Sequence, residues 1–315
     1  MPKISVIMSV YMEPVDWIVS SIDSILNQSY NNFEFIIVND KPERSENAVL
    51  LEDYARRDDR IKIVTNKTNI GLTKSLNKAL SIAAGEFIAR MDADDISLPR
   101  RFEKQVRVLE DSENRVDVCG TGIEYFGNFQ GILLFPERHE DCLLFLDNCF
   151  AHSSIMMNRK LLALRYDENC KAAQDYDLWN RAYQSGCVFY NIPEVLLRYR
   201  YSDNQISTAK SSIQMNVACK VRRNALDYYM KNRDIPFQIG DNPIRISWVG
   251  KIIKLLELKE EQNALLFYYL CLSLNEPKYK IIMYSCSSYI KGKLSSKRMV
   301  SVIKHAMKNN DKRKY

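Results

Sequence analysis

The sequence predicts an α/β protein in which a doubly wound, mostly parallel sheet is followed by a helical C-terminal extension. Over roughly the first 125 residues, short apolar runs alternate with amphipathic segments of helical period, which is the pattern of repeated βαβ units. From about residue 210 onward the periodicity is helical throughout, which places a domain boundary near that residue. The 315 residues are 46% hydrophobic and 27% charged, a balance that excludes disordered, collagen-like and coiled-coil proteins.

The first four strands are expected where short apolar runs are bounded by polar residues, as in buried strands. They cover 4–10, 34–39, 61–65 and 87–91. Helices are expected between them, one opening at Pro14 and two more over 47–57 and 73–84. Proline suits the first turn of a helix because the N–H that it lacks would have no partner there, and Gly85 is a typical stop signal.

The later part of the chain has a less regular pattern. A further helix is expected after Pro99, followed by a strand over 116–126. The remaining expected elements are a helix near 139–148, a strand over 153–157, a helix over 175–185 and a strand-like segment over 187–200.

The eight cysteines form no C-x-x-C pair and no cluster of zinc-binding spacing, which favours free thiols in a reducing compartment. The N-terminal apolar run lacks a small-residue cleavage site and runs into Glu13-Pro14, so we do not expect a signal peptide. No stretch reaches the roughly 18 apolar residues of a membrane span. Together these features predict a cytoplasmic protein.

Charge is distributed unevenly along the chain. Residues 1–209 hold 24 Lys and Arg against 31 Asp and Glu, a net −7, whereas residues 210–315 hold 21 against 8, a net +13. We expect the basic region, above all 291–315, to contact the anionic inner face of the membrane. Its segment 251–274 suits either an interfacial helix or a helix packed on the catalytic domain. Nucleic acid is disfavoured because Tyr315 is the only aromatic residue among the tail's nine basic charges.

Polar residues stand where each of the first four strands ends. Tyr11 follows the first strand, Asp40 the second, 66–69 the third and 92–95 the fourth. Open parallel sheets bind ligands beyond the carboxyl ends of their strands. The sequence therefore predicts one binding edge formed by these four tips.

The acidic cluster after the fourth strand is the candidate for phosphate chemistry. The turn after the first strand contains no glycine, and neither G-x-G-x-x-G nor a P-loop is present to hold phosphate on backbone amides. Asp92 and Asp94 point the same way in an extended segment, and two such carboxylates suit Mg²⁺ or Mn²⁺ bound to a diphosphate. The alternative is an acidic loop that caps the helix at Pro99, a role that suits Asp95.

Four other residues each allow a functional and a structural interpretation. Asp40 either accepts bonds from a nucleotide or is a turn residue, and Tyr11 either stacks on a base or packs in the ordinary way. Lys74 lies in the first turn of its helix, where the dipole disfavours a cation, so it indicates an anionic partner or is a solvated surface residue. Asp175 is either a general base or a helix cap.

Seven segments, in matching order and spacing, resemble bacterial family 2 glycosyltransferases of the GT-A fold. They are ISVIMSVYMEP at 4–14, SIDSILNQSYNNFEFIIVND at 21–40, NIGLTKSLNKAL at 69–80, GEFIARMDADDISLPRRFEKQ at 85–105, AHSSIMMNRKLL at 151–162, QDYDLWNRAYQSG at 174–186 and LLRYRYSDNQIS at 196–207. The resemblance implies a catalytic domain over 1–210, with a nucleotide-sugar half over about 1–125 and an acceptor half over about 126–210. The helical basic region is 211–315.

The resemblance also implies residue roles. The residues expected to line the uridine pocket are Ser9, Tyr11, Glu13 and Asp40. The residues expected to support the nucleotide and phosphates are Asn69 and Lys74, with Asp92 and Asp94 as the DxD pair that holds Mn²⁺ or Mg²⁺. Asp175 would be the catalytic base, and His152 and Asp95 would lie near the acceptor or sugar.

The sequence departs from the family pattern at several positions. Met12 stands where Asn is usual, Lys41-Pro42 replaces small residues after Asp40, and Gln174 replaces a common Glu beside the expected base. Tyr201-Ser202 falls where relatives often carry Tyr-Arg-x-His, whose His can serve the metal or the diphosphate. These departures question the loop over the base and the completeness of the metal site.

The activity implied is inverting transfer of a hexose, such as glucose or galactose, from a UDP-sugar to a hydroxyl of a growing, lipid-linked bacterial surface glycan. Asp175 would take the acceptor proton, while the metal and Lys74 would offset charge on the leaving diphosphate. One alternative is a nucleotidyltransferase, for which a Gly-rich loop is expected after the first strand. Another is a non-catalytic sugar-binding relative, in which Asp92, Asp94 and Asp175 need not be kept.

Overall fold

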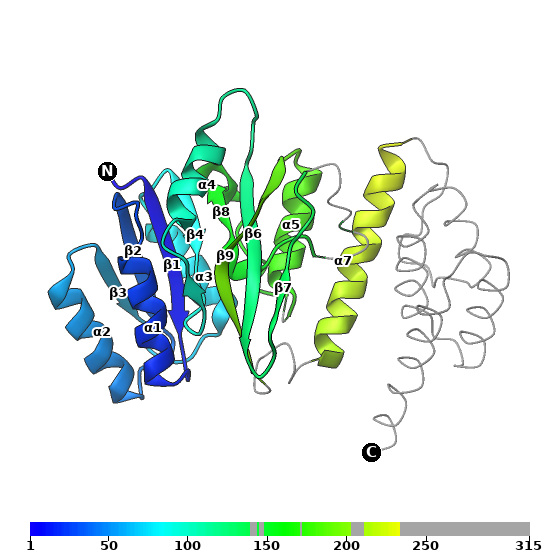
Figure 1. Cartoon of the computed structure of the whole chain (residues 1–315). Coiled ribbons are helices and arrows are strands. Elements are labelled where there is room, and N and C mark those ends of the chain that lie inside the picture. Colours follow the sequence, from blue (N-terminus) through cyan, green and yellow to red (C-terminus); the bar gives the residue numbers. More distant parts are fainter. Residues whose placement is uncertain (139–143, 145–147, 171, 203–210, 234–315) are drawn as a thin grey trace, which may run out of the picture. The chain divides into compact units, whose positions relative to one another are not determined.

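The computed structural model describes residues 1–138, 144, 148–170, 172–202 and 211–233 (Figure 1). One compact unit contains 1–143 and 148–214, and we describe it by itself. The helix expected near 139–148 and the C-terminal region beyond 233 lie outside the described residues, apart from 144 and 148. The helix α7 (Ser211–Lys231) begins at the expected domain boundary, which stays a prediction.

The described residues form a mixed sheet in the order β3-β2-β1-β4-β8-β6-β9-β5, with β7 paired to β6. Its strands are β1 (Ile4–Val10), β2 (Phe33–Asn39), β3 (Ile61–Thr65), β4 (Phe87–Arg90), β5 (Ile96–Ser97), β6 (Val118–Gly127), β7 (Gly131–Leu133), β8 (Met156–Asn158) and β9 (Phe189–Tyr201). The pairs β1–β2, β2–β3 and β1–β4 are parallel, as expected, and β6–β9 is parallel as well. The strand β8 is antiparallel to both β4 and β6 and joins the two parallel parts.

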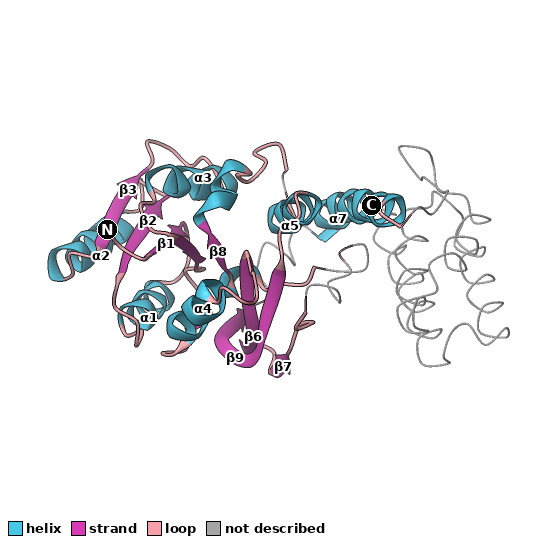
Figure 2. Ribbon diagram, turned by 90° about the horizontal axis from the view of Figure 1, so that it is seen from above, coloured by secondary structure: helices cyan, strands magenta, loops and turns pink. Residues whose placement is uncertain are grey.

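Helices cover both faces of the parallel part of the sheet. They are α1 (Val15–Leu26), α2 (Ser45–Arg57), α3 (Leu72–Ile82) and α4 (Arg101–Glu110), and α5 (Gln174–Gln184) follows later in the chain. Figure 2 shows α1 and α4 on one face of the sheet and α3 on the other. This is the doubly wound arrangement that the alternating pattern predicts.

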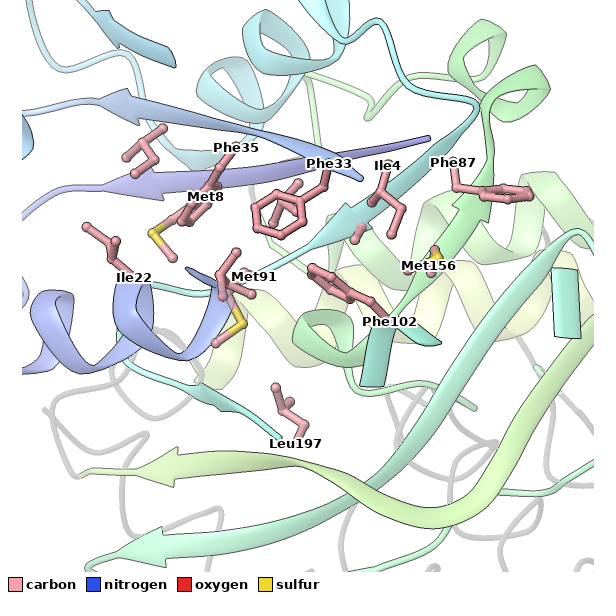
Figure 3. Packing of buried hydrophobic residues seen from close by; sticks show 14 of the residues in the cluster. Ile4, Met8, Ile22, Phe33, Phe35, Phe87, Met91, Phe102, Met156 and Leu197 are labelled. Atoms are coloured by element: carbon pink, nitrogen blue, oxygen red, sulfur yellow. The ribbon is translucent and has the colours of Figure 1, made fainter. Parts of the chain in front are cut away.

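The strand β1 is buried on both faces because its side chains alternate between two layers of helices. Met8 belongs to the core cluster that includes Phe35 of β2 and Ile22 of α1, and Figure 3 shows these three side chains close together. Ile7 is fully buried on the other face, where α3 contacts β1 and β2. This almost entirely buried strand supports the loop that follows it.

The structure differs from the expected elements where local hydrogen bonding overrides apolar pattern. The strand expected over 153–157 begins only at Met156, because His152–Ser154 forms a 3-10 turn (η2). The hairpin strand β7 was not expected, since its three residues are too few to show a period. A second short 3-10 helix, η3 (Arg159–Ala163), follows β8. Among the described residues, no helix is both long and apolar enough to cross a membrane.

Candidate active site at the carboxyl edge of the sheet

The ends of β1, β2, β3 and β4 lie at one edge of the sheet, as the parallel pairing requires. Backbone bonds continue the ladder past the strands, since the N–H of Asp40 donates to Val10 (2.8 Å) and that of Asn66 donates to Asn39 (3.0 Å). The N–H of Met91 donates to the carbonyl of Ile7 over 3.0 Å. The loops that carry the candidate residues are therefore anchored directly on the sheet.

Three carboxylates gather after β4. Asp92, Asp94 and Asp95 each place one carboxylate oxygen within 4.8 Å of the others. The main chain of Asp92 is held from two sides, because its N–H donates to Ser153 Oγ (2.9 Å) and its carbonyl accepts from Ser21 Oγ (2.7 Å). The cluster is thus fixed on the fold rather than carried by a free loop.

Arg90, the last residue of β4, forms an ion pair with Asp92 through both terminal nitrogens of its guanidinium. Its side chain is 2% exposed, whereas that of Asp92 is 29% exposed. A buried bidentate pair of this kind orients a carboxylate as well as neutralising it. The sequence analysis assigned no role to Arg90, which lies inside an apolar run.

Within the part of the chain that the structure describes, neither Asp94 nor Asp95 forms an ion pair of this kind. Burial, together with the negative charges of Asp92 and Glu13, raises the pKa of Asp94 to about 7. Burial and the charges of its two neighbours also raise the pKa of Asp95 well above its ordinary value. Two carboxyl groups with raised pKa values are a site that a cation would stabilise.

Asp95 does not cap the helix at Pro99, which corrects that alternative. Its Oδ1 instead accepts the N–H of Arg200 on β9 over 2.8 Å, and α4 begins at Arg101 without a side-chain cap. Its Oδ2 is buried and accepts no hydrogen bond of normal geometry from the described residues. An unsatisfied buried carboxylate oxygen is costly unless a cation or proton meets it, so the residues present fit a hard divalent cation.

Asp40 lies at the end of β2 and is 2% exposed. Its Oδ1 accepts from Asn66 Nδ2 (2.8 Å) and the N–H of Ile70 (2.9 Å), and its Oδ2 accepts from Asn69 Nδ2 (3.1 Å) and the N–H of Gly71 (2.9 Å). In this structure Asp40 therefore organises the 66–71 loop, and Asn69 is one of its donors. Direct contact of either residue with a nucleotide stays a prediction.

Tyr11 presents an exposed ring beside the end of β1. The side chain is 43% exposed, and Lys41 Nζ lies 5.8 Å from the ring centroid. Its backbone is fixed, since its N–H donates to Glu13 Oε2 (2.7 Å) and its carbonyl accepts from Asn47 Nδ2 (2.9 Å). Burial raises the pKa of the Glu13 carboxyl, which this N–H partly offsets. The geometry suits stacking of the ring on a planar group.

Ser9 and Lys74 lie at the same edge. Ser9 is half-buried one residue before the end of β1, and Lys74 is exposed in the first turn of α3. In the described part of the chain, no carboxylate lies within ion-pair distance of Lys74. Gly71, the N-cap of α3, has a φ of +87°, a left-handed conformation that favours glycine. Because no described carboxylate pairs with Lys74, its charge is available to an anionic ligand.

Asp175 is the second residue of α5, and the N-cap is Ala173, so the prediction of Asp175 as a helix cap is wrong. Its Oδ2 accepts a hydrogen bond from Asn148 Nδ2 over 2.8 Å. Burial raises the pKa of Asp175, and its hydrogen bonds and the charge of Arg90 lower it in part. A half-buried carboxylate with a raised pKa suits a general base.

His152, on η2, contacts Tyr166 through an Nε2–Oη distance of 2.7 Å, and its ring also packs edge-to-face on Trp179. Burial and the charge of Arg90 lower its pKa well below the ordinary value, so the imidazole is neutral. Contact of His152 with an acceptor or sugar stays a prediction.

Sequence reasoning missed three residues at this edge. Arg90 and Asn148 contact the expected acidic residues directly. Arg200 donates through Nε to the carbonyl of Asp94 over 2.9 Å and stacks on Trp17. An arginine inside an apolar strand is a signal that could have revealed Arg90, because buried arginines are rare without a partner.

The family model for glycosyl transferase family 2 matches residues 5–163. An uncharacterized glycosyltransferase of Haemophilus influenzae is 32% identical over 312 residues, covering 92% of this chain and 95% of its own length. The O-antigen biosynthesis glycosyltransferase WbnJ of Escherichia coli is 38% identical over 221 residues, covering 67% of this chain and 83% of its own. S. aureus TarS 1-349 in complex with UDP-GlcNAc superposes with a TM-score of 0.60 at 15% identity, covering 99% of this chain and 93% of TarS 1-349.

Proposed function

The chain belongs to glycosyl transferase family 2, and from that premise we propose that it transfers a hexose from a UDP-sugar to a hydroxyl of a growing bacterial surface glycan, with inversion at the anomeric carbon. In its GT-A fold the nucleotide-sugar half of the site would lie at the carboxyl edge of β1, β2 and β4. The observation that carries the proposal is the acidic cluster of Asp92, Asp94 and Asp95 at that edge.

Asp175 is the proposed general base. Its carboxylate accepts the proton of the acceptor hydroxyl while that oxygen forms a bond to the anomeric carbon and the bond from that carbon to the UDP oxygen breaks. Attack from the face opposite UDP converts an α-linked donor into a β-linked product. The hydrogen bond from Asn148 supports this role because it fixes the direction of the carboxylate.

The uracil and ribose would lie against the turn that contains Ser9, Tyr11 and Glu13, with the Asp40 loop as the opposite wall. Tyr11 supports this placement because its exposed ring offers a stacking face on a fixed backbone. Lys74 would meet the diphosphate, since its charge has no partner among the described residues. His152 and Asp95 would lie on the acceptor or sugar side.

The acidic cluster would hold Mn²⁺ or Mg²⁺ through Asp92 and Asp94, with the carboxylate of Asp95 beside them. A bound divalent cation supplies charge neutralisation for the leaving diphosphate. The unpartnered Oδ2 of Asp95 and the raised pKa of Asp94 support this assignment. The Tyr201-Ser202 departure leaves the cluster without the usual histidine, so these carboxylates carry the binding.

The acceptor would be a lipid-linked glycan of the O-antigen, capsule or lipooligosaccharide type. The similarity to WbnJ, whose name assigns it to O-antigen biosynthesis, supports this class. The basic C-terminal region would then contact the inner face of the membrane, supported by its net charge of +13. The structure describes only 211–233 of that region.

A nucleotide-sugar panel tests the reaction. Wild-type protein is incubated with UDP-glucose, UDP-galactose, UDP-GlcNAc and GDP-mannose plus Mn²⁺, and nucleotide release is measured with and without EDTA. We expect hydrolysis of at least one UDP-sugar, its loss in EDTA and in Asp94→Ala, and full activity in the control Asp53→Asn, a surface acid of α2 that pairs with Arg57. Full turnover in EDTA would contradict the metal, and UDP binding without any turnover would indicate a sugar-binding relative.

Liposome co-sedimentation tests the membrane contact. Full-length protein and a 1–290 truncation are compared on anionic vesicles at low and high salt. We expect the full-length protein alone to bind, and only at low salt, because exposed charges are screened beyond a Debye length. Equal binding of both proteins, or of neither, would contradict the role of the tail.

A further inference from the structure

The ion pair between Arg90 and Asp92 affects which carboxylates of the acidic cluster can bind the proposed divalent cation. Both carboxylate oxygens of Asp92 accept bonds from the guanidinium of Arg90, which is 2% exposed at the end of β4. The Nε of Arg90 is buried and has no partner among the described residues, so the hydrogen bonds that this side chain makes there go to Asp92. A carboxylate in a bidentate pair cannot offer both oxygens to a metal at the same time.

Other cations near the cluster do not take this role. Arg101 is fully buried, but its donors go to the carbonyls of Arg90 (2.9 Å) and Ile155 (3.1 Å) and to Gln105 Oε1 (3.0 Å). Arg200 donates its main-chain N–H to Oδ1 of Asp95, and its side-chain Nε donates to the main-chain carbonyl of Asp94. Among the described residues, Arg90 is therefore the counter-ion of the Asp92 carboxylate.

The other two carboxylates are placed differently. Asp95 is only 1% exposed, and its Oδ2 accepts no hydrogen bond of normal geometry from the described residues. Asp94 forms no ion pair with a described residue, and the negative charges of Asp92 and Glu13 act on its carboxyl group. Carboxylate charge that no described cation pairs with is thus concentrated on Asp94 and Asp95, within 4.8 Å of Asp92.

We propose that Arg90 is a positioning residue that holds the Asp92 carboxylate out of the cation's ligand set, so that Asp94 and Asp95 bind the cation and Asp92 faces the donor. This divides the cluster differently from the expected Asp92–Asp94 pair. It rests on the proposed function, because it assumes a divalent cation at this edge. Arg90 also lowers cation affinity, since it adds a positive charge and occupies a third carboxylate.

The test is Mn²⁺ binding to the full chain, measured by isothermal titration calorimetry and by the loss of the free Mn²⁺ electron paramagnetic resonance signal. Arg90→Met frees Asp92, so we expect tighter Mn²⁺ binding, on the order of tenfold. In an Asp92→Asn background the same substitution should tighten Mn²⁺ binding less than in the wild type, because it then removes the charge of Arg90 but frees no carboxylate. Asp92→Asn alone should weaken binding less than Asp94→Asn and Asp95→Asn, which should each weaken it by about tenfold or more.

Folding is checked by circular dichroism for each variant. Where Arg90→Met does not fold, Arg90→Lys replaces it, since lysine keeps the charge but loses the two-point contact, and a smaller tightening is expected. Unchanged or weaker Mn²⁺ binding in the folded Arg90 variant would overturn the proposal, as would a loss in Asp92→Asn equal to that in Asp94→Asn. Absence of Mn²⁺ binding in the wild type would instead overturn the proposed metal, which keeps the two failures apart.

Discussion

Asn148 donates a hydrogen bond to the carboxylate of Asp175 over 2.8 Å, across 27 positions of sequence. The bond favours the ionised carboxylate, while burial of Asp175 favours the protonated acid and raises its pKa. The balance between the hydrogen bond and burial determines the pH at which Asp175 loses its proton and can act as a base. Because Asn148 lies in a loop and Asp175 in the first turn of α5, this balance is set by the fold.

The pH profile of transfer should follow Asp175. A base acts only when deprotonated, so the rate should fall as the pH drops through the raised pKa of Asp175, and this acid limb should lie above the ordinary range of an aspartate. Asn148→Leu removes a bond to the charged form, so the limb should move to higher pH. Initial rates from pH 4.5 to 8 measure it. Asn169→Leu, which removes a surface amide bonded to Asp167, is the control and should leave the limb unmoved.

Asp175→Asn should lower the transfer rate by on the order of 10²- to 10⁴-fold while leaving UDP affinity intact, since general base catalysis contributes about that much. The matched control is Asp177→Asn on the same helix turn, whose carboxylate pairs with Arg181 over 2.8 Å. It should cost at most about 1 kcal/mol of stability and little rate. A rate loss in Asp175→Asn that simply follows a lower melting temperature would assign Asp175 to structure instead.

Asp40→Asn should destabilise the fold. The substitution places an amide where two donors point at each carboxylate oxygen, so at least one of four hydrogen bonds becomes a repulsive contact. We expect a loss of about 2–4 kcal/mol in the free energy of unfolding, measured by urea denaturation. Asp59→Asn, in the turn before β3, is the control. If stability is unchanged and UDP affinity falls, Asp40 acts on the nucleotide rather than on the 66–71 loop.

Tyr11→Ala should weaken UDP binding by roughly tenfold to a hundredfold, because stacking of a base on an aromatic ring contributes about 1–3 kcal/mol. Tyr11→Phe keeps the ring and should bind UDP as the wild type does. Calorimetric titration of UDP with Mn²⁺ present measures both. Equal affinity in the alanine variant would show that the exposed ring does not meet the base.

The expected parallel strands and helices agree with the structure where a long periodic segment buries one or both faces. The run at 4–10 is β1 with the bounds expected, and Asp40 and Asp92 follow their strands as predicted. Errors occur where the pattern is short. The hairpin strand β7 and the 3-10 turn at His152 are three residues each, too short to show an apolar period, so their local hydrogen bonds override the pattern.

The sequence by itself determined the sheet, the polar residues at its carboxyl edge, the acidic cluster and the family, because apolar period and motif spacing are local properties of the chain. Only the tertiary structure decided the partners of the candidate groups. Asp40 is surrounded by donors from 66–71, Asp92 is paired with Arg90, and Asp175 meets Asn148. Burial and charge at each carboxylate are sums over segments far apart in the chain, so the protonation and availability of these groups follow from packing rather than from their own sequence neighbours.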